Sequence, residues 1–142
     1  MKAAVFHKPG DALTIETVPQ PSISDREMLV KVSHCGICGT DLHAVKHTEA
    51  LIKTSREVGG GFKLTTDQPV VLGHEFCAEI IDYGTGTNRT YATGQLVCSM
   101  PVLLRPQTVG LGYSDQAPGG FSEYMVLSEA LLEPVPAGIS AE

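Results

Sequence analysis

Glycine and proline interrupt this chain about every ten residues, which limits the length of any helix or strand. The 142 residues include 15 glycines and nine prolines. Between these breaks, apolar and polar residues alternate in short runs, as they do in half-buried strands. We therefore expect one mainly β domain, an antiparallel barrel or sandwich with short helices and long loops. The expected strands are residues 1–7, 13–18, 28–34, 76–83, 95–100, 121–127 and 131–135.

Three other stretches do not alternate in this way. Residues 40–45 predict one short helix with Thr40 or Asp41 near its N-terminal cap. Residues 46–67 show no clean period around Gly59-Gly60-Gly61, so we expect a flexible surface excursion there. Residues 101–120 hold prolines, glycines and few periodic apolar positions, so we expect a long loop.

The charge pattern argues against two classes of partner. The net charge is −6 and no basic cluster exceeds two residues, whereas nucleic-acid binding needs a positive stripe. No apolar run approaches the ~20 residues that cross a bilayer. The N-terminus lacks the apolar core of an export signal, so we expect a cytoplasmic protein with reduced cysteines.

A dense group of polar side chains lies at residues 34–43, where Cys35 and Cys38 form a Cys-x-x-Cys pair. A thioredoxin-like redox pair would need a parallel βαβ setting, and a four-cysteine zinc site would need a second such pair. The remaining interpretation has one sulfur binding a metal while the other packs as a small apolar side chain. We favour Cys38 as the ligand, because it is nearer Thr40, Asp41 and His43.

A second polar group, Gly73-His74-Glu75, follows an apolar run. His74 alone could be a buried imidazole bonded to a backbone carbonyl. The adjacent Glu75 favours a metal, because a carboxylate is costly to bury unless a cation meets it. Thiolate and imidazole suit zinc, and a catalytic zinc takes three protein ligands, for which Glu75 is the only further candidate. Asp41 can accept a hydrogen bond from the ligand imidazole.

The run CGICGTDLH at residues 35–43, followed by VLGHE at 71–75, resembles the zinc-dependent medium-chain alcohol dehydrogenases. The opening MKAAVF, the late GGFSEY and the closing VPAGISAE match as well. The resemblance implies that residues 1–142 form the GroES-like catalytic domain of such an enzyme. It implies one catalytic zinc, an alcohol or polyol substrate, and hydride transfer to NAD or NADP.

The resemblance also implies a role for each site residue. Cys38 and His74 match the zinc thiolate and imidazole, and Glu75 matches a carboxylate near the metal. Asp41 matches the carboxylate behind the imidazole.

Two further residues match the route of the proton. Thr40 matches the hydroxyl that takes the substrate's proton, and His43 matches the histidine that passes it towards solvent. Zinc lowers the pKa of a bound alcohol, a hydroxyl relays the proton, and hydride leaves for the nicotinamide.

The sequence departs from the family pattern in three ways. The Rossmann domain is absent from residues 1–142, and the third zinc ligand is expected beyond Glu142, so we expect an excised or truncated domain that is inactive alone. Only Cys98 lies between Val97 and Gly119, so we expect no structural zinc. The 36-residue step from Cys38 to His74 is long, and we expect it to shape the substrate entrance. Any homo-oligomer would form through the missing domain.

Two alternatives stay open at this point. One is a zinc-free quinone reductase relative, which shares the fold but usually lacks these ligands. The other is a non-catalytic GroES-like binding or co-chaperone module, which would have no use for this group of residues.

Overall fold

The structure is a computed structural model that describes residues 1–60, 64–65 and 67–141, and its class is mainly β, as expected. The described part of the chain holds no helix of the length and apolar character that a bilayer crossing requires. The helices are α1 (Gly39–Lys46), α2 (Thr48–Glu57) and the 3-10 turn η1 (Glu129–Leu131). The strands are β1 (Lys2–Phe6), β2 (Thr14–Thr17), β3 (Glu27–Gly36), β4 (Val70–Val71), β5 (Glu75–Tyr83), β6 (Leu96–Ser99), β7 (Val102–Leu103), β8 (Val109–Gly110), β9 (Tyr124–Ser128) and β10 (Leu132–Pro134).

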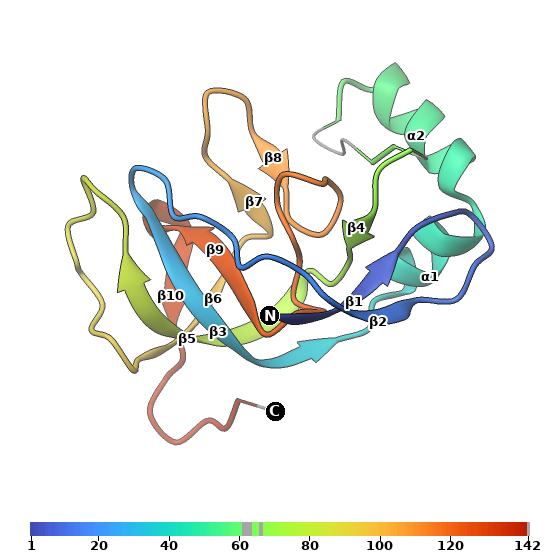
Figure 1. Cartoon of the computed structure of the whole chain (residues 1–142). Coiled ribbons are helices and arrows are strands. Elements are labelled where there is room, and N and C mark those ends of the chain that lie inside the picture. The colour runs from blue at the N-terminus through green and yellow to red at the C-terminus, as the bar shows by residue number, and fades with distance from the viewer. Residues whose placement is uncertain (61–63, 66, 142) are drawn as a thin grey trace.

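The strands form three antiparallel sheets (Figure 1). A five-stranded sheet has the order β10-β6-β5-β3-β9, a three-stranded sheet has the order β2-β1-β4, and β7 pairs with β8. Within the described residues these sheets do not close into one barrel. The long strands β3 and β5 are the centre of the molecule, and the end of β3 and the start of β5 lie near the site described below.

The main core lies over the five-stranded sheet. Met28, Val30, Ile80 and Met125 are fully buried in it. Strand β3 is buried at all of its first four residues and only its second half emerges, so the expected alternation of faces fails at its start. The reason is that both faces are covered there, since Met28, Leu29 and Val30 all belong to the main core and Glu27 is paired with Arg105.

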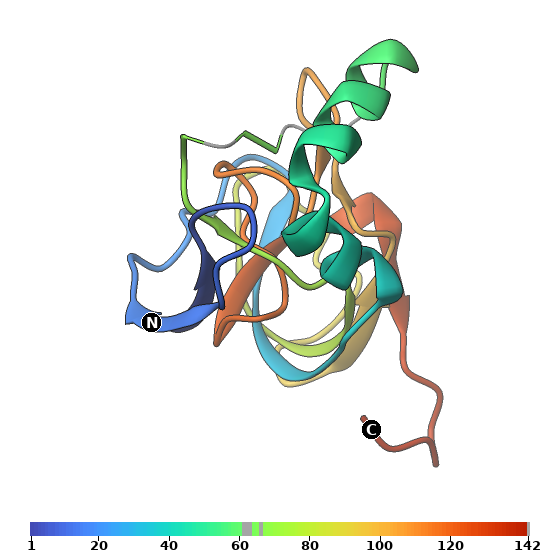
Figure 2. The same cartoon turned by 90° about the vertical axis from the view of Figure 1, so that its right-hand side faces the viewer.

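The expected surface excursion at residues 46–67 is wrong, because α2 occupies residues 48–57. Figure 2 shows α2 continuing beyond α1 and projecting from the body of the molecule. Thr48 is buried and its hydroxyl donates to the Ala44 carbonyl at 2.5 Å, which ties the two helices together. Gly60 donates its backbone N–H to the Ser55 carbonyl just after α2, while Gly61 lies outside the described residues.

The expected long loop at residues 101–120 contains the short hairpin β7–β8 and is anchored to the core. Arg105 forms a bidentate ion pair with Glu27, from Nε at 2.7 Å and from Nη2 at 3.1 Å. The Glu27 side chain is only 3% exposed. This buried pair holds the loop against the start of β3.

Candidate metal centre

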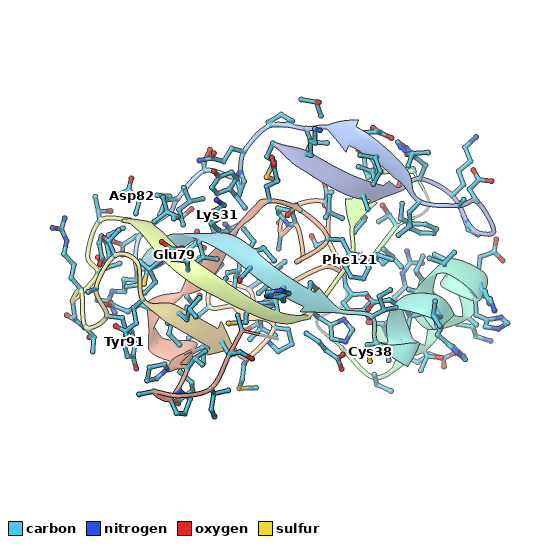
Figure 3. All side chains as sticks on the ribbon, turned by 90° about the horizontal axis from the view of Figure 1, so that it is seen from below. Lys31, Cys38, Glu79, Asp82, Tyr91 and Phe121 are labelled. Atoms are coloured by element: carbon cyan, nitrogen blue, oxygen red, sulfur yellow. The ribbon has the colours of Figure 1, made fainter. Side chains whose placement is uncertain are left out.

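Cys38 lies where β3 runs into α1, as Figure 3 shows. It is the N-cap residue of α1, with extended backbone angles. Asp41, in the first turn, accepts the backbone N–H of Cys38 at Oδ2 (3.0 Å). The N-cap of α1 is therefore two residues before Thr40, the earlier of the two residues expected near it, and Asp41 takes part through its side chain. The positive end of the helix dipole favours an anionic group at this position.

Gly73 determines how the chain enters the second polar group. It has φ +95°, a conformation that side-chain-bearing residues rarely adopt. A Cβ at Gly73 would lie 2.7 Å from Cδ1 of Phe121 and 2.9 Å from Sγ of Cys35. The segment is held by Phe121, whose backbone N–H donates to Leu72 at 3.0 Å, and by Gly120, which donates to Gly73 at 2.8 Å. This close packing of backbones fixes the direction in which the next residue, His74, leaves the core.

The two polar groups meet in space, as the sequence predicts. One ligand atom each from Cys38, His74 and Glu75 all lie within 4.8 Å of one another. Sulfur, ring nitrogen and carboxylate oxygen form a donor set that suits a borderline-soft divalent ion such as zinc. Cys38 and His74 are partly buried, whereas Glu75 is exposed. The donor chemistry and the spacing both fit a zinc ion.

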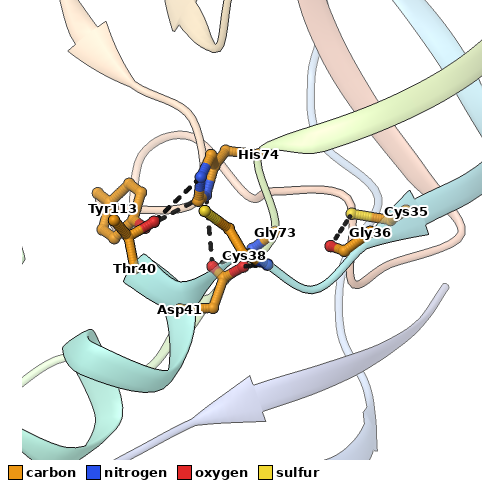
Figure 4. Close-up of polar contacts among 8 residues, drawn as sticks. All are labelled: Cys35, Gly36, Cys38, Thr40, Asp41, Gly73, His74 and Tyr113. Carbon is orange, nitrogen blue, oxygen red and sulfur yellow. Dashed lines mark hydrogen bonds and ion pairs between the residues drawn. The ribbon is translucent and has the colours of Figure 1, made fainter.

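Asp41 connects the two polar groups (Figure 4). Its side chain is only 3% exposed, and its Oδ1 accepts the backbone N–H of Gly73 at 3.3 Å and lies 3.4 Å from Nδ1 of His74. A carboxylate beside Nδ1 favours the tautomer that carries its proton there. In that tautomer Nε2 carries the lone pair that could bind a metal, and its neighbour in the structure is Oγ1 of Thr40.

Thr40 also contacts the imidazole. Its Oγ1 is 3.1 Å from Nε2 of His74 and accepts a hydrogen bond from the hydroxyl of Tyr113 at 3.0 Å. The same hydroxyl is 3.2 Å from Nδ1 of His74. Burial raises the pKa of Tyr113 to about 12, against the hydrogen bond to Thr40, which lowers it. Nothing in the sequence around Tyr113 marks it as a site residue.

His43 and Cys35 lie outside this hydrogen-bonded group. His43 is exposed on α1, about one turn after Thr40, with its ring centre 4.8 Å from that of His47. Cys35 packs against the main core, where burial raises the pKa of its thiol to about 11. Its sulfur is not among the grouped ligand atoms in the described residues, in agreement with the packing role expected for it.

The chain matches known proteins along its whole length. The family model of the alcohol dehydrogenase GroES-like domain matches residues 24–137. The L-threonine 3-dehydrogenase of Rhizobium rhizogenes is 31% identical, over 100% of this chain and 41% of that protein. The (R,R)-butanediol dehydrogenase of Bacillus subtilis is 33% identical, over 100% of this chain and 42% of that protein.

Comparison of the fold also finds a dehydrogenase. The crystal structure of 2R,3R-butanediol dehydrogenase from Bacillus subtilis superimposes with a TM-score of 0.76 and 30% identity, over 99% of this chain and 42% of that one. The chain thus spans about two fifths of the length of the curated relatives it matches. Fold and sequence together show that the chain belongs to the GroES-like domain family of the zinc-dependent medium-chain alcohol dehydrogenases.

Proposed function

We propose that this chain is the zinc-binding catalytic domain of a dehydrogenase that oxidises a small secondary alcohol to a carbonyl compound. The observation that carries the proposal is the convergence of Cys38, His74 and Glu75 within 4.8 Å. The substrate class follows the names of two relatives, a threonine 3-dehydrogenase and a butanediol dehydrogenase, because both names describe oxidation of a secondary alcohol.

Cys38 and His74 would hold the zinc through sulfur and ring nitrogen, with the carboxylate of Glu75 beside them. Bound zinc supplies a Lewis acid that lowers the pKa of an alcohol in its open coordination position. Asp41 keeps the imidazole oriented, since its carboxylate lies 3.4 Å from Nδ1 and also accepts the N–H of Gly73. The residues around the site thus hold both ligands before any substrate arrives.

Thr40 and His43 would carry the proton away. Thr40 is exposed at the rim of the site, and its Oγ1 could accept the alcohol's proton as its own hydroxyl proton passes on towards His43. Its hydroxyl is oriented by the hydrogen bond from Tyr113 at 3.0 Å. His43 lies about one turn further along α1 and is exposed to solvent, so its imidazole can exchange the proton with water.

We infer that the hydride acceptor, NAD or NADP, is bound by residues outside the stretch 1–142. This stretch has no Gly-x-Gly-x-x-Gly sequence for cradling a pyrophosphate. The four free cysteines fit a reducing compartment such as the cytoplasm.

Zinc analysis of the purified chain is the first test. We expect about one zinc per chain, and strong loss of zinc in Cys38→Ser and in His74→Ala. Cys98→Ser is the matched control, because Cys98 is an exposed thiol outside the ligand group. Because the third zinc ligand is expected beyond Glu142, the result that would overturn the proposal is a folded wild-type sequence that takes up no zinc even within the chimera described next.

Activity can be tested in a chimera in which residues 1–142 replace the corresponding part of Bacillus subtilis butanediol dehydrogenase. We expect alcohol-dependent reduction of the nicotinamide, followed by its absorbance. Thr40→Ala should lower kcat about 100-fold while zinc content stays unchanged. A zinc-loaded chimera that oxidises no small secondary alcohol would contradict the proposed reaction.

A further inference from the structure

Two cysteines that the metal centre does not use face each other across neighbouring strands. In the pairing of β5 with β6, Ala78 lies opposite Val97 and Glu79 lies opposite Leu96. Continued by one residue, this register places Cys77 opposite Cys98. Both are free thiols in the structure.

The backbone hydrogen bonds show what kind of pair this is. Ile80 donates its N–H to Gln95 at 3.0 Å and accepts the N–H of Gly94 at 2.8 Å, so Gly94 and Gln95 together oppose Ile80 at a hydrogen-bonded position with one extra residue. Hydrogen-bonded and non-hydrogen-bonded pairs alternate along antiparallel strands. Cys77 and Cys98, three residues further along, therefore form a non-hydrogen-bonded pair. The Cα atoms of such pairs lie about 4.5 Å apart, which is within the range of disulfides.

The two thiols also lie on the same face of the sheet. Their neighbours Ala78 and Val97 are 0% exposed and point into the core, so Cys77 and Cys98 point to the opposite face. The side chains of Cys77 and Cys98 lie close enough to interact. Cys77 is only 8% exposed, whereas Cys98 is exposed to solvent.

We propose that Cys77 and Cys98 form an oxidation site for hydroperoxides, at which a cross-strand disulfide replaces two thiols. The exposed sulfur of Cys98 attacks one peroxide oxygen, the O–O bond breaks, and Cys98 becomes a sulfenic acid while the other oxygen leaves as water or an alcohol. The sulfur of Cys77 then attacks the sulfenic sulfur, the S–O bond breaks, and water leaves. The two thiols lose two electrons and two protons in total, and the peroxide is reduced by two electrons.

The link would fix the sheet next to the metal centre. It would join β6 to β5 two residues after Glu75 and close a loop containing the twenty residues between the cysteines. A disulfide across a loop of this length restricts the unfolded chain, and we expect the oxidised form to unfold at a temperature about 5–10 °C higher.

Peptide mapping after hydrogen peroxide treatment tests the proposal on the purified zinc-loaded chain. Trypsin cleaves after lysine and arginine but not between Arg105 and Pro106, so Cys77 falls in peptide 64–89 and Cys98 in peptide 90–142. Cys35 and Cys38 share the separate peptide 32–46. After remaining thiols are alkylated, we expect a covalent pair of peptides 64–89 and 90–142 that a thiol reductant separates.

Cys98→Ser should lose the linked peptides and the rise in unfolding temperature. Cys35→Ala is the matched control and should keep both, since Cys35 packs against the main core. Cys98→Ser alters an exposed residue, so a loss of the linked peptides in this variant cannot be attributed to a disturbed core. Conversion of Cys98 to sulfinic or sulfonic acid without a linked product would overturn the proposal, and so would a linked product that persists in Cys98→Ser.

Discussion

The hydroxyl of Tyr113 lies 3.2 Å from Nδ1 of His74, although 39 residues separate the two in sequence. It also donates a hydrogen bond to Thr40 at 3.0 Å, so one side chain from the 101–120 segment orients a candidate ligand and a candidate proton acceptor. The tyrosine is 3% exposed and packs in a smaller core with Ala44 of α1. The aromatic body is thus structural, while the hydroxyl belongs to the site.

Tyr113→Phe should separate these two contributions. The ring and its packing remain, but Thr40 loses its donor and the imidazole loses a neighbour, so we expect zinc affinity to fall about 10-fold. Competition with a chromophoric zinc chelator measures it. Tyr91→Phe is the control, because that hydroxyl bonds the Leu132 carbonyl at 3.2 Å, away from the site. Equal zinc affinity in Tyr113→Phe and wild type would refute the positioning role.

Asp41→Asn should weaken both folding and zinc binding. The carboxylate accepts the N–H groups of Cys38 and Gly73, and an amide can offer only one oxygen to them. A buried donor then loses its partner, so the free energy of unfolding should fall by about 1–3 kcal/mol. Urea titration measures this. Asp82→Asn is a matched control, since Asp82 also accepts a backbone N–H, from Tyr83 at 2.8 Å, but in an exposed position. Equal losses in the two variants would contradict this role of Asp41.

Gly73→Ala tests the close approach that directs His74. The added Cβ would meet Phe121 and Cys35 at less than 3.0 Å, in a backbone conformation that alanine disfavours. We expect the free energy of unfolding to fall by about 3 kcal/mol. Gly10→Ala separates the two causes, because Gly10 has φ +83° but nothing within 4 Å of an added methyl group. It should cost only about 1 kcal/mol. A smaller loss of unfolding free energy in Gly73→Ala than in Gly10→Ala would contradict this, because it would mean that Phe121 and Cys35 move aside for the added methyl group.

The grouping of the candidate ligands Cys38, His74 and Glu75 could be predicted from the sequence because their chemistry is local. Thiol, imidazole and carboxylate stand in two short groups with glycines beside them, and strand β3 and the start of α1 also fall close to their expected bounds. Tyr113 could not be found in this way. It lies between Gly112 and Ser114 in a stretch without periodicity, and its role depends on contacts across 39 and 73 residues of sequence.

Helix α2 escapes prediction for a different reason. Its inward stripe consists of Thr48, Leu51, Ile52 and Ser55, the spacing of a helical face. Two of the four are polar, so apolar residues alone do not show the spacing of a helix there. The buried hydroxyl of Thr48 is satisfied because it donates to the Ala44 carbonyl. Sequence signals that favour a helix are the absence of glycine and proline from residues 48–57 and the spacing of Lys53 and Glu57 by four residues.

Arg105→Met should destabilise the fold by leaving the carboxylate of Glu27 buried without its cation. We expect the free energy of unfolding to fall by about 3 kcal/mol. Lys53→Met is the control, because the Lys53–Glu57 pair, at 3.9 Å on the surface of α2, should contribute less than about 0.5 kcal/mol. Chemical denaturation of both variants measures the difference. An effect of Arg105→Met no larger than that of the control would mean that the buried pair does not hold the loop.

Acid should remove the contribution of Glu16 to the stability of the fold. The carboxylate of Glu16 on β2 bonds the imidazole of His7, just after β1. Hydrogen bonds from Thr14 and then His7 lower the pKa of this carboxyl below its usual 4.5. The folded state therefore binds the proton only at a lower pH than the unfolded state does, so the stabilisation is complete above 4.5 and is lost as the pH falls through the folded-state pKa.

We accordingly expect Glu16→Gln to lower the urea midpoint at about pH 6 and to approach wild type on acidification. Thr14→Val, which removes the larger cause of the shift, should show part of the same effect. Urea midpoints of the three proteins, measured across the acid range, provide the comparison. A gap between wild type and Glu16→Gln that widens as the pH is lowered would contradict the expected sign, because a depressed carboxyl pKa can stabilise the fold only while the carboxylate is charged.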